Sequence, residues 1–142
     1  MTHRAKIILA GLAAAALAAP LAAQDGGERV ELTKGQAKLA KLLDGRVAGE
    51  PERCIRTFPS RNLTIIDGTA LVMDAGDTVW VNYTQDPAGL DDDDALLIRK
   101  FGTVSQLCRL DNVTTFDRFN GFYTGNVFLT DFVPYRKVDA VS

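Results

Sequence analysis

The stretch NLTIIDGTALVMDAGDTVWVNYT, residues 62–84, decides the fold class of this chain of 142 residues. It holds three short runs rich in Ile, Val and Thr, separated first by Asp67-Gly68 and then by the DAGD of residues 74–77. β-Branched runs of this length, bounded by Asp and Gly, are typical of strands rather than of helices. The stretch therefore predicts three antiparallel strands in a meander.

The Asp-Gly pair of this stretch predicts the turn of the first hairpin. A two-residue loop of type I′ needs positive φ at both central residues, a conformation that Gly and Asp tolerate. Such a turn sets Ile65 opposite Ala70 and Leu63 opposite Val72. The hairpin is therefore expected to carry one apolar face.

Further strand-like runs follow along the chain. They are ALLIRKFG at 95–102, VSQLCRL at 104–110, and a hairpin with an Asn-Gly turn at Asn120-Gly121 before a last strand that Pro134 ends. Several short strands at this spacing are typical of small antiparallel β domains. The predicted fold is mainly β, a small barrel or sandwich of six to eight strands.

One short helix is predicted upstream of the strands, over about residues 33–43. Thr33 and Gln36 stand at the spacing of a capping box, which marks the start of a helix. With a β core over about 54–137, the chain is expected to form one β-rich domain over 24–142.

The N-terminus has the pattern of a Sec signal peptide over residues 1–23. Arg4 and Lys6 precede an apolar, Ala-rich run at 7–19, and small residues follow. The run is shorter than the roughly 20 residues of a membrane-spanning helix. We therefore predict export to the periplasm or the cell exterior, without stable membrane insertion after cleavage.

The charge balance excludes some classes of partner. Export removes two of the 16 basic residues, so that 14 remain against 18 acidic ones. An acidic domain is repelled by nucleic acid and by anionic membrane surfaces. Nucleic acid is therefore not expected as a partner.

The chain has two cysteines, Cys54 and Cys108. In an oxidising compartment two cysteines are most simply read as one disulfide. A redox-active pair usually has Cys-x-x-Cys spacing, which this chain lacks. A structural disulfide is therefore predicted.

Three motifs carry a resemblance to a known family: RCIRTF at 53–58, SQLCRLD at 105–111 and FVPY at 132–135. Taken together they resemble a family of small exported proteobacterial proteins with a domain of unknown function, over Cys54 to Lys137. The resemblance implies export and architecture. It implies no activity.

Few catalytic chemistries fit the residues. The only histidine, His3, lies in the predicted signal peptide, and there is no Gly-rich phosphate loop. We therefore predict no catalytic residue, no cofactor and no metal site. The acidic run Asp91–Asp94 suggests a solvated loop first, and as an alternative a carboxylate-dependent hydrolase or a weak divalent-cation binder.

Aromatic residues concentrate near the C-terminus, where residues 116–135 contain five of the seven Phe. Such rings are expected first of all in the core. Across the Asn-Gly turn, however, Phe119 faces Phe122 and Arg118 faces Tyr123, so that the tip of this hairpin exposes rings. The candidate recognition surface comprises Trp80, Arg118, Phe119, Phe122 and Tyr123.

The function predicted from these features is that of a non-catalytic binding or structural module of the cell envelope. Its expected partner is an envelope protein or a glycan.

Overall fold

The computed structural model describes residues 31–59 and 61–138. The predicted signal peptide lies outside these residues. The structure contains the helix α1 (Lys34–Leu42) and the short 3-10 helix η1 (Pro87–Gly89). The ten strands are β1 (Arg46–Ala48), β2 (Cys54–Arg56), β3 (Thr64–Ile66), β4 (Ala70–Asp74), β5 (Thr78–Asn82), β6 (Asp94–Arg99), β7 (Gln106–Cys108), β8 (Asn112–Asp117), β9 (Tyr123–Val127) and β10 (Val133–Lys137).

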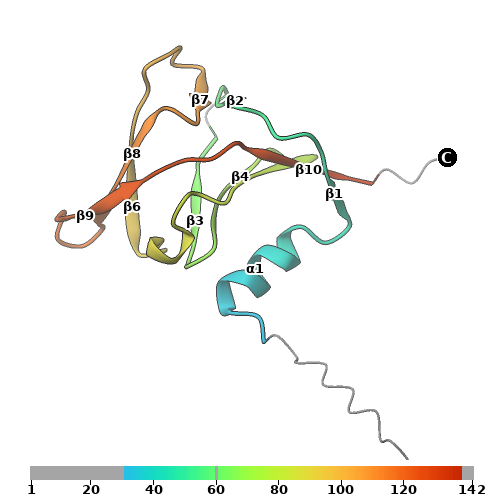
Figure 1. The fold of residues 1–142 in the computed structure, drawn as a ribbon, viewed down its shortest axis with the longest axis horizontal. Coiled ribbons are helices and arrows are strands. Elements are labelled where there is room, and N and C mark those ends of the chain that lie inside the picture. The colour runs from blue at the N-terminus through green and yellow to red at the C-terminus, as the bar shows by residue number, and fades with distance from the viewer. Residues whose placement is uncertain (1–30, 60, 139–142) are drawn as a thin grey trace, which may run out of the picture. The chain divides into compact units, whose positions relative to one another are not determined.

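The strands form three antiparallel sheets (Figure 1). A five-stranded sheet has the order β1-β10-β5-β4-β3, a two-stranded sheet pairs β2 with β7, and a three-stranded sheet has the order β6-β8-β9. Over residues 31–59 and 61–138, the prediction of a mainly β, antiparallel fold with one α-helix is confirmed. The barrel is wrong, because the sheets do not close on one another. The strand count is too low, because strands of only three residues show no clear period in a sequence.

The five-stranded sheet is the middle layer of the domain. On one face Ile66, Val72 and Val79 pack with Leu39 of α1. The other face contributes Leu71 and Met73 to a second cluster, which also takes residues from the two-stranded and three-stranded sheets. In the part of the chain that the structure describes, a helix, a central sheet and two smaller sheets therefore follow in succession, with an apolar cluster on each side of the central sheet.

The predicted capping box at the start of α1 is present. The amide of Thr33 donates to Oε1 of Gln36 at 2.9 Å, and the amide of Gln36 donates to Oγ1 of Thr33 at 3.2 Å. Two of the amides left free at a helix start are thereby satisfied.

The register predicted for the first hairpin is wrong by one residue. Ile65 lies opposite Leu71, and Ile66 lies opposite Ala70, around a three-residue loop. Only Gly68 of this loop has a positive φ, of 54°, so the turn is not type I′. The amide of Gly68 donates to the carbonyl of Leu90 at 2.8 Å, a tertiary contact that the local sequence does not reveal.

The predicted disulfide joins Cys54 to Cys108. The two residues lie directly opposite each other in the β2–β7 pair, with 4.0 Å between their Cα atoms. The bond therefore closes the smallest of the three sheets, next to the buried Ile55 and Leu107.

We expect Gly35→Ala to destabilise the protein. Gly35 is buried in the first turn of α1, where an added Cβ would overlap the carbonyl oxygen of Asp67 and Oγ1 of Thr69. The substitution favours the isolated helix by up to about 1 kcal/mol, but overpacking costs roughly 1–3 kcal/mol. Thermal melting should show a lower midpoint.

The matched control is Gly102→Ala, where an added Cβ meets no atom within 4 Å and φ is not positive. Its melting temperature should stay the same or rise slightly. An unchanged melting temperature for Gly35→Ala would show that α1 does not rest on the β3–β4 loop.

Candidate functional site

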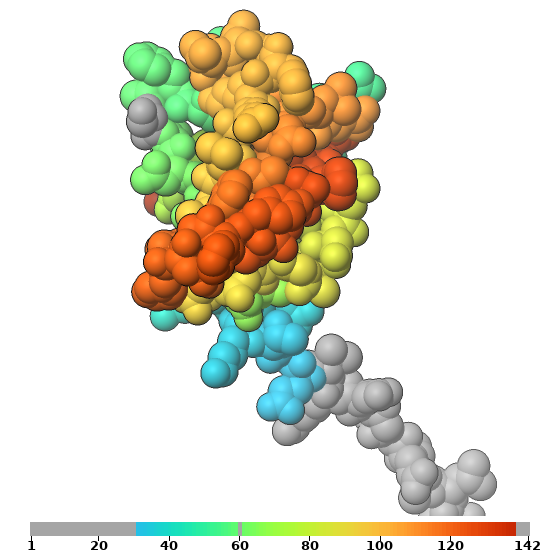
Figure 2. Space-filling view, turned by 90° about the vertical axis from the view of Figure 1, so that its left-hand side faces the viewer, coloured from blue at the N-terminus to red at the C-terminus, as the bar shows by residue number. Residues whose placement is uncertain are grey.

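The face of the three-stranded sheet that points away from the core is the candidate site. Strand register and burial separate its two faces: Val113, Thr115 and Val127 are buried, and their neighbours point outward. Figure 2 shows this side of the molecule, with β9 as an uncovered orange-red band. We call it the outer face, and it comprises Ala95, Leu97, Arg99, Asn112, Thr114, Phe116, Tyr123, Asn126 and Phe128.

A β-bulge in β9 gives the outer face its composition. Thr115 pairs with Gly125 and Phe116 pairs with Tyr123, so Thr124 has no partner in the register. The extra residue changes the alternation, and Tyr123 therefore points outward. The hydroxyl of Thr124 donates to the carboxylate of the buried Asp94 at 2.6 Å, which stabilises the bulge.

The outer face is almost free of charge. Its only ionisable group that carries charge at neutral pH is Arg99, although 24% of the chain is Asp, Glu, Lys or Arg. The rings of Phe116 and Tyr123 meet edge to face, with 5.9 Å between their centroids. Phe128 exposes 61% of its surface. The face therefore combines aromatic rings with amide and hydroxyl groups.

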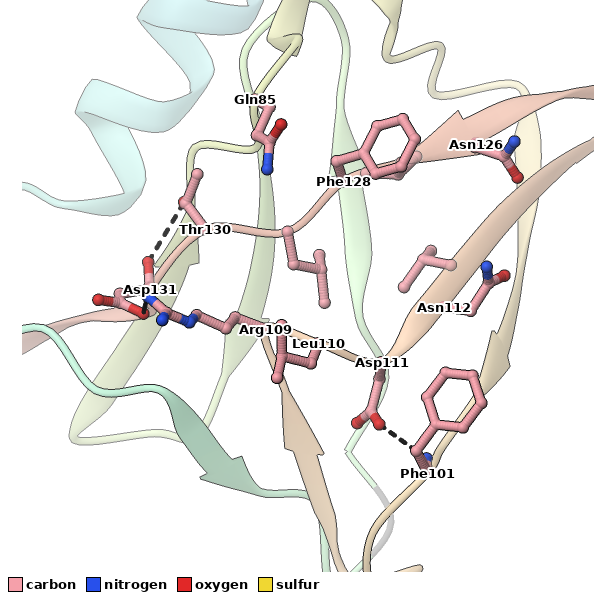
Figure 3. Close-up of a pocket in the computed structure, with 13 residues that line it drawn as sticks. Gln85, Phe101, Arg109, Leu110, Asp111, Asn112, Asn126, Phe128, Thr130 and Asp131 are labelled. Atoms are coloured by element: carbon pink, nitrogen blue, oxygen red, sulfur yellow. Dashed lines mark hydrogen bonds and ion pairs between the residues drawn. The ribbon is translucent and has the colours of Figure 1, made fainter.

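A groove of about 560 Å³ lies at the Phe128 end of the outer face (Figure 3). Exposed side chains of Phe101, Leu110 and Phe128 line it, together with the buried Val113 and Leu129. The amide side chains among its lining residues are those of Gln85, Asn112 and Asn126.

Hydrogen bonds that the sequence does not reveal hold one wall of the groove. Asn82 is fully buried, and its side chain bonds the carbonyl of Thr130 at 2.7 Å and the amides of Thr84 and Thr130 at 3.0 Å. Thr84 has a φ of 49°, which is unusual for a β-branched residue. The next amide, that of Gln85, donates to the carbonyl of Phe128 at 2.9 Å. A strained backbone of this kind persists only where surrounding contacts fix it.

The acids of the groove already have partners. Asp131 pairs with Arg109 at 3.1 Å. The carboxylate of Asp111 accepts from the amides of Phe101 at 2.8 Å and Cys108 at 2.7 Å. These charges hold the loops that surround the groove, and their bonding capacity is partly used within the protein.

The tip of the β8–β9 hairpin lies at the other end of the outer face. Backbone amides of Asn120 and Phe119 donate to the Asp117 carboxylate at 3.0 and 2.8 Å and hold the pKa of Asp117 below its usual range. Phe119 and Phe122 expose 86% and 72% of their surface.

Two expectations for this region are wrong. Phe116, not Arg118, faces Tyr123, because the loop spans four residues, 118–121, rather than two. The assignment of the aromatic segment to the core also fails: of its five Phe, only Phe132 is buried. Short polar strands hold the other rings at the surface.

The predicted recognition residues are only partly brought together. Phe119, Phe122 and Tyr123 share the β8–β9 hairpin. Arg118 also belongs to it, but its guanidinium donates to the carbonyl of Asp94 at 2.9 Å. Trp80 lies on β5, half-buried against the core.

The acidic run does not act as one unit. Asp91 and Asp92 are exposed and lie with Asp67, their carboxylate oxygens within 4.8 Å of one another. Lys38 approaches Asp92 to 3.9 Å. Asp94 is buried. Sequence reasoning missed Asp67, because the contact between the β3–β4 loop and the loop before β6 is tertiary.

Sequence reasoning also missed the groove and most of the outer face. The sequence pattern that could have predicted the outer face lies in β8, where the polar Asn112 and Thr114 alternate with the buried Val113 and Thr115. This alternation predicts an exposed sheet face. The low charge of this face becomes visible only when β6 and β9 are placed beside β8.

Comparison with family models, curated proteins and solved structures finds no match for this chain. The resemblance to a family of exported proteobacterial proteins therefore stays a prediction. No helix in residues 31–59 and 61–138 has the length and hydropathy needed to cross a membrane.

We expect the double variant Phe119→Ser, Phe122→Ser to fold normally. Both rings are exposed, and surface substitutions usually change the free energy of unfolding by no more than about 0.5 kcal/mol each. Phe132→Ser is the matched control, because Phe132 is fully buried and the loss of such a ring costs about 3–5 kcal/mol. Thermal melting and circular dichroism compare the two. Unfolding of the double variant would show that the tip belongs to the core.

Proposed function

We propose that the protein is exported and serves as a non-catalytic binding module of the cell envelope, with the outer face as its contact surface. The signal-like N-terminus and the Cys54–Cys108 disulfide support export, because disulfides persist in oxidising compartments.

The near-absence of charge on the outer face carries the proposal. The solvent-exposed face of a sheet ordinarily carries charged residues. These charges keep the protein soluble and oppose association with the sheets of other molecules. Here Leu97, Tyr123 and Phe128 are exposed between amides and hydroxyls, and Arg99 alone carries a charge. We take this combination of exposed apolar side chains and missing charge as the mark of an interaction site.

The bonding of the polar groups supports a non-catalytic role. The two cysteines are joined to each other, so neither offers a thiolate. In the groove, Asp111 accepts hydrogen bonds from two backbone amides, and Asp131 accepts one from the guanidinium of Arg109. Neither is placed as a free acid or base for catalysis.

Co-sedimentation with envelopes prepared from a proteobacterium tests the proposal. We expect the wild-type protein to sediment with them, and the double variant Tyr123→Ser, Phe128→Ser to remain in the supernatant. The matched control is Phe58→Ser, which removes a ring that is 75% exposed and lies outside the outer face. The proposal fails if the double variant, shown by melting to be folded, sediments like the wild type.

The alternative function, a weak divalent-cation site or a carboxylate-dependent hydrolase, has one observation in its favour. Asp67 joins Asp91 and Asp92, so three carboxylates converge. A second cavity of about 650 Å³ includes Asp92 and Asp94, but also Lys38, Arg61 and Arg118, which offset the acidic charge.

Thermal melting with calcium tests the divalent-cation site of this alternative. A bound cation adds about 2.7 kcal/mol to the free energy of unfolding when its free concentration is a hundred times the dissociation constant of the site. Because the carboxylates are exposed and Lys38 lies beside them, we expect no change in melting temperature with millimolar calcium. A rise that is lost in the variant Asp67→Asn, Asp91→Asn would favour the alternative.

A further inference from the structure

We propose that the ligand of the outer face is a neutral polysaccharide, which lies along β8 and β9 from the hairpin tip to the groove. This inference rests on the proposed binding function and names the class of partner. Rings at the two ends of the face stack on sugar rings, and the amides that line the groove at the Phe128 end bond sugar hydroxyls.

The near-absence of charge on the outer face favours a neutral ligand. A polyanion such as nucleic acid, or an anionic lipid surface, needs several basic side chains in one patch. The outer face offers only Arg99, and the groove pairs Arg109 with Asp131. A neutral ligand gives up the hydration of its hydroxyls, which the amides can replace, whereas a charged one would give up the larger hydration of a charge without gaining a partner.

The distribution of rings distinguishes a sugar chain from a protein. Protein interfaces concentrate their large rings at the centre of the patch and surround them with polar groups. The outer face has its rings at the ends instead: its central row contains Leu97, Thr114 and Asn126 and no ring, while Phe116 and Tyr123 lie at one end and Phe128 lies at the other. A chain of sugar rings fits such alternation, because each sugar has a C–H face and a rim of hydroxyls.

The rings can bind sugars by their faces. The face of an aromatic ring carries partial negative charge, and the C–H hydrogens of a sugar are slightly positive because each carbon bears oxygen. Phe128 is 61% exposed and Tyr123 is 56% exposed, so each has surface free for stacking.

The amides supply the hydrogen bonds. The side chains of Gln85, Asn112 and Asn126 line the groove, and none of the three bonds another of the groove residues drawn in Figure 3. A side-chain amide both donates and accepts, as a sugar hydroxyl does, so the two kinds of group pair in either direction. The amides are therefore complementary to hydroxyls without any change in protonation.

The strands β8 and β9 hold Asn112 and Asn126 at fixed spacing. Asn112 and Phe116 lie four residues apart on β8, about 13 Å along a strand, which favours an oligosaccharide over a single sugar. Sites built on strands keep their geometry better than sites on loops. The face is thus formed before the ligand arrives.

Nuclear magnetic resonance of the ¹⁵N-labelled domain tests this inference, because the side-chain NH₂ groups of Asn112 and Asn126 report directly on the site. The neutral probes are cellohexaose, maltohexaose, xylohexaose, chitohexaose, mannan and neutral O-polysaccharide released from lipopolysaccharide. Heparin and polygalacturonate are the anionic comparisons. We expect at least one neutral probe to shift both NH₂ signals, and neither anionic polymer to do so.

Matched variants identify the residues that bind. Asn112→Ala with Asn126→Ala should weaken the binding of that probe about tenfold or more, because two hydrogen bonds are lost. Asn62→Ala should leave it unchanged, since Asn62 is an exposed asparagine away from the outer face. The backbone amide spectrum shows that each variant is folded.

Any of the following results overturns the proposal of a neutral polysaccharide ligand. If no neutral probe shifts the signals while envelope co-sedimentation still depends on Tyr123 and Phe128, the partner is not a neutral polysaccharide and the binding function stands. If co-sedimentation also does not depend on Tyr123 and Phe128, both the polysaccharide ligand and the proposed binding function are wrong. Signals that shift with protein concentration alone show that a second copy of the chain covers the face, and binding of the anionic polymers alone shows a charged ligand.

Discussion

The burial of β4 on both faces is the constraint on which the rest of the structure depends. Ala70, Leu71, Val72 and Met73 are consecutive, and none exposes more than 3% of its surface. Because consecutive side chains of a strand point to opposite faces, two separate layers must cover this strand. Helix α1 supplies one layer, and the two smaller sheets supply the other.

This requirement positions the candidate site. The three-stranded sheet uses one face, with Val113 and Val127, to cover the central sheet. Among the described residues, no other layer packs against its other face. The buried side chain of Asn82 ties β5 to the segment at Thr130, and thereby fixes the groove relative to the core. The site is therefore as rigid as the layers beneath it.

Charged groups around the site serve mainly to hold the backbone. Arg118 bonds the carbonyl of Asp94, Asp117 accepts from the amides of the hairpin tip, and Asp111 holds the loop after β6. The outer face itself consists of neutral groups apart from Arg99. This division explains how a chain with 24% charged residues presents a sheet face with a single charged side chain.

The sequence by itself determined the class of the fold and its local signals. Alternation and turn residues predicted antiparallel strands, Thr33 and Gln36 predicted the helix start, and two cysteines left one possible disulfide. Tertiary structure decided the rest. The turn at Gly68 depends on the carbonyl of Leu90, and the neutral face depends on setting β6 and β9 beside β8. Neither could be read from local pattern, because contacts between residues far apart in the chain select among registers and layers that the local sequence leaves nearly equal in energy.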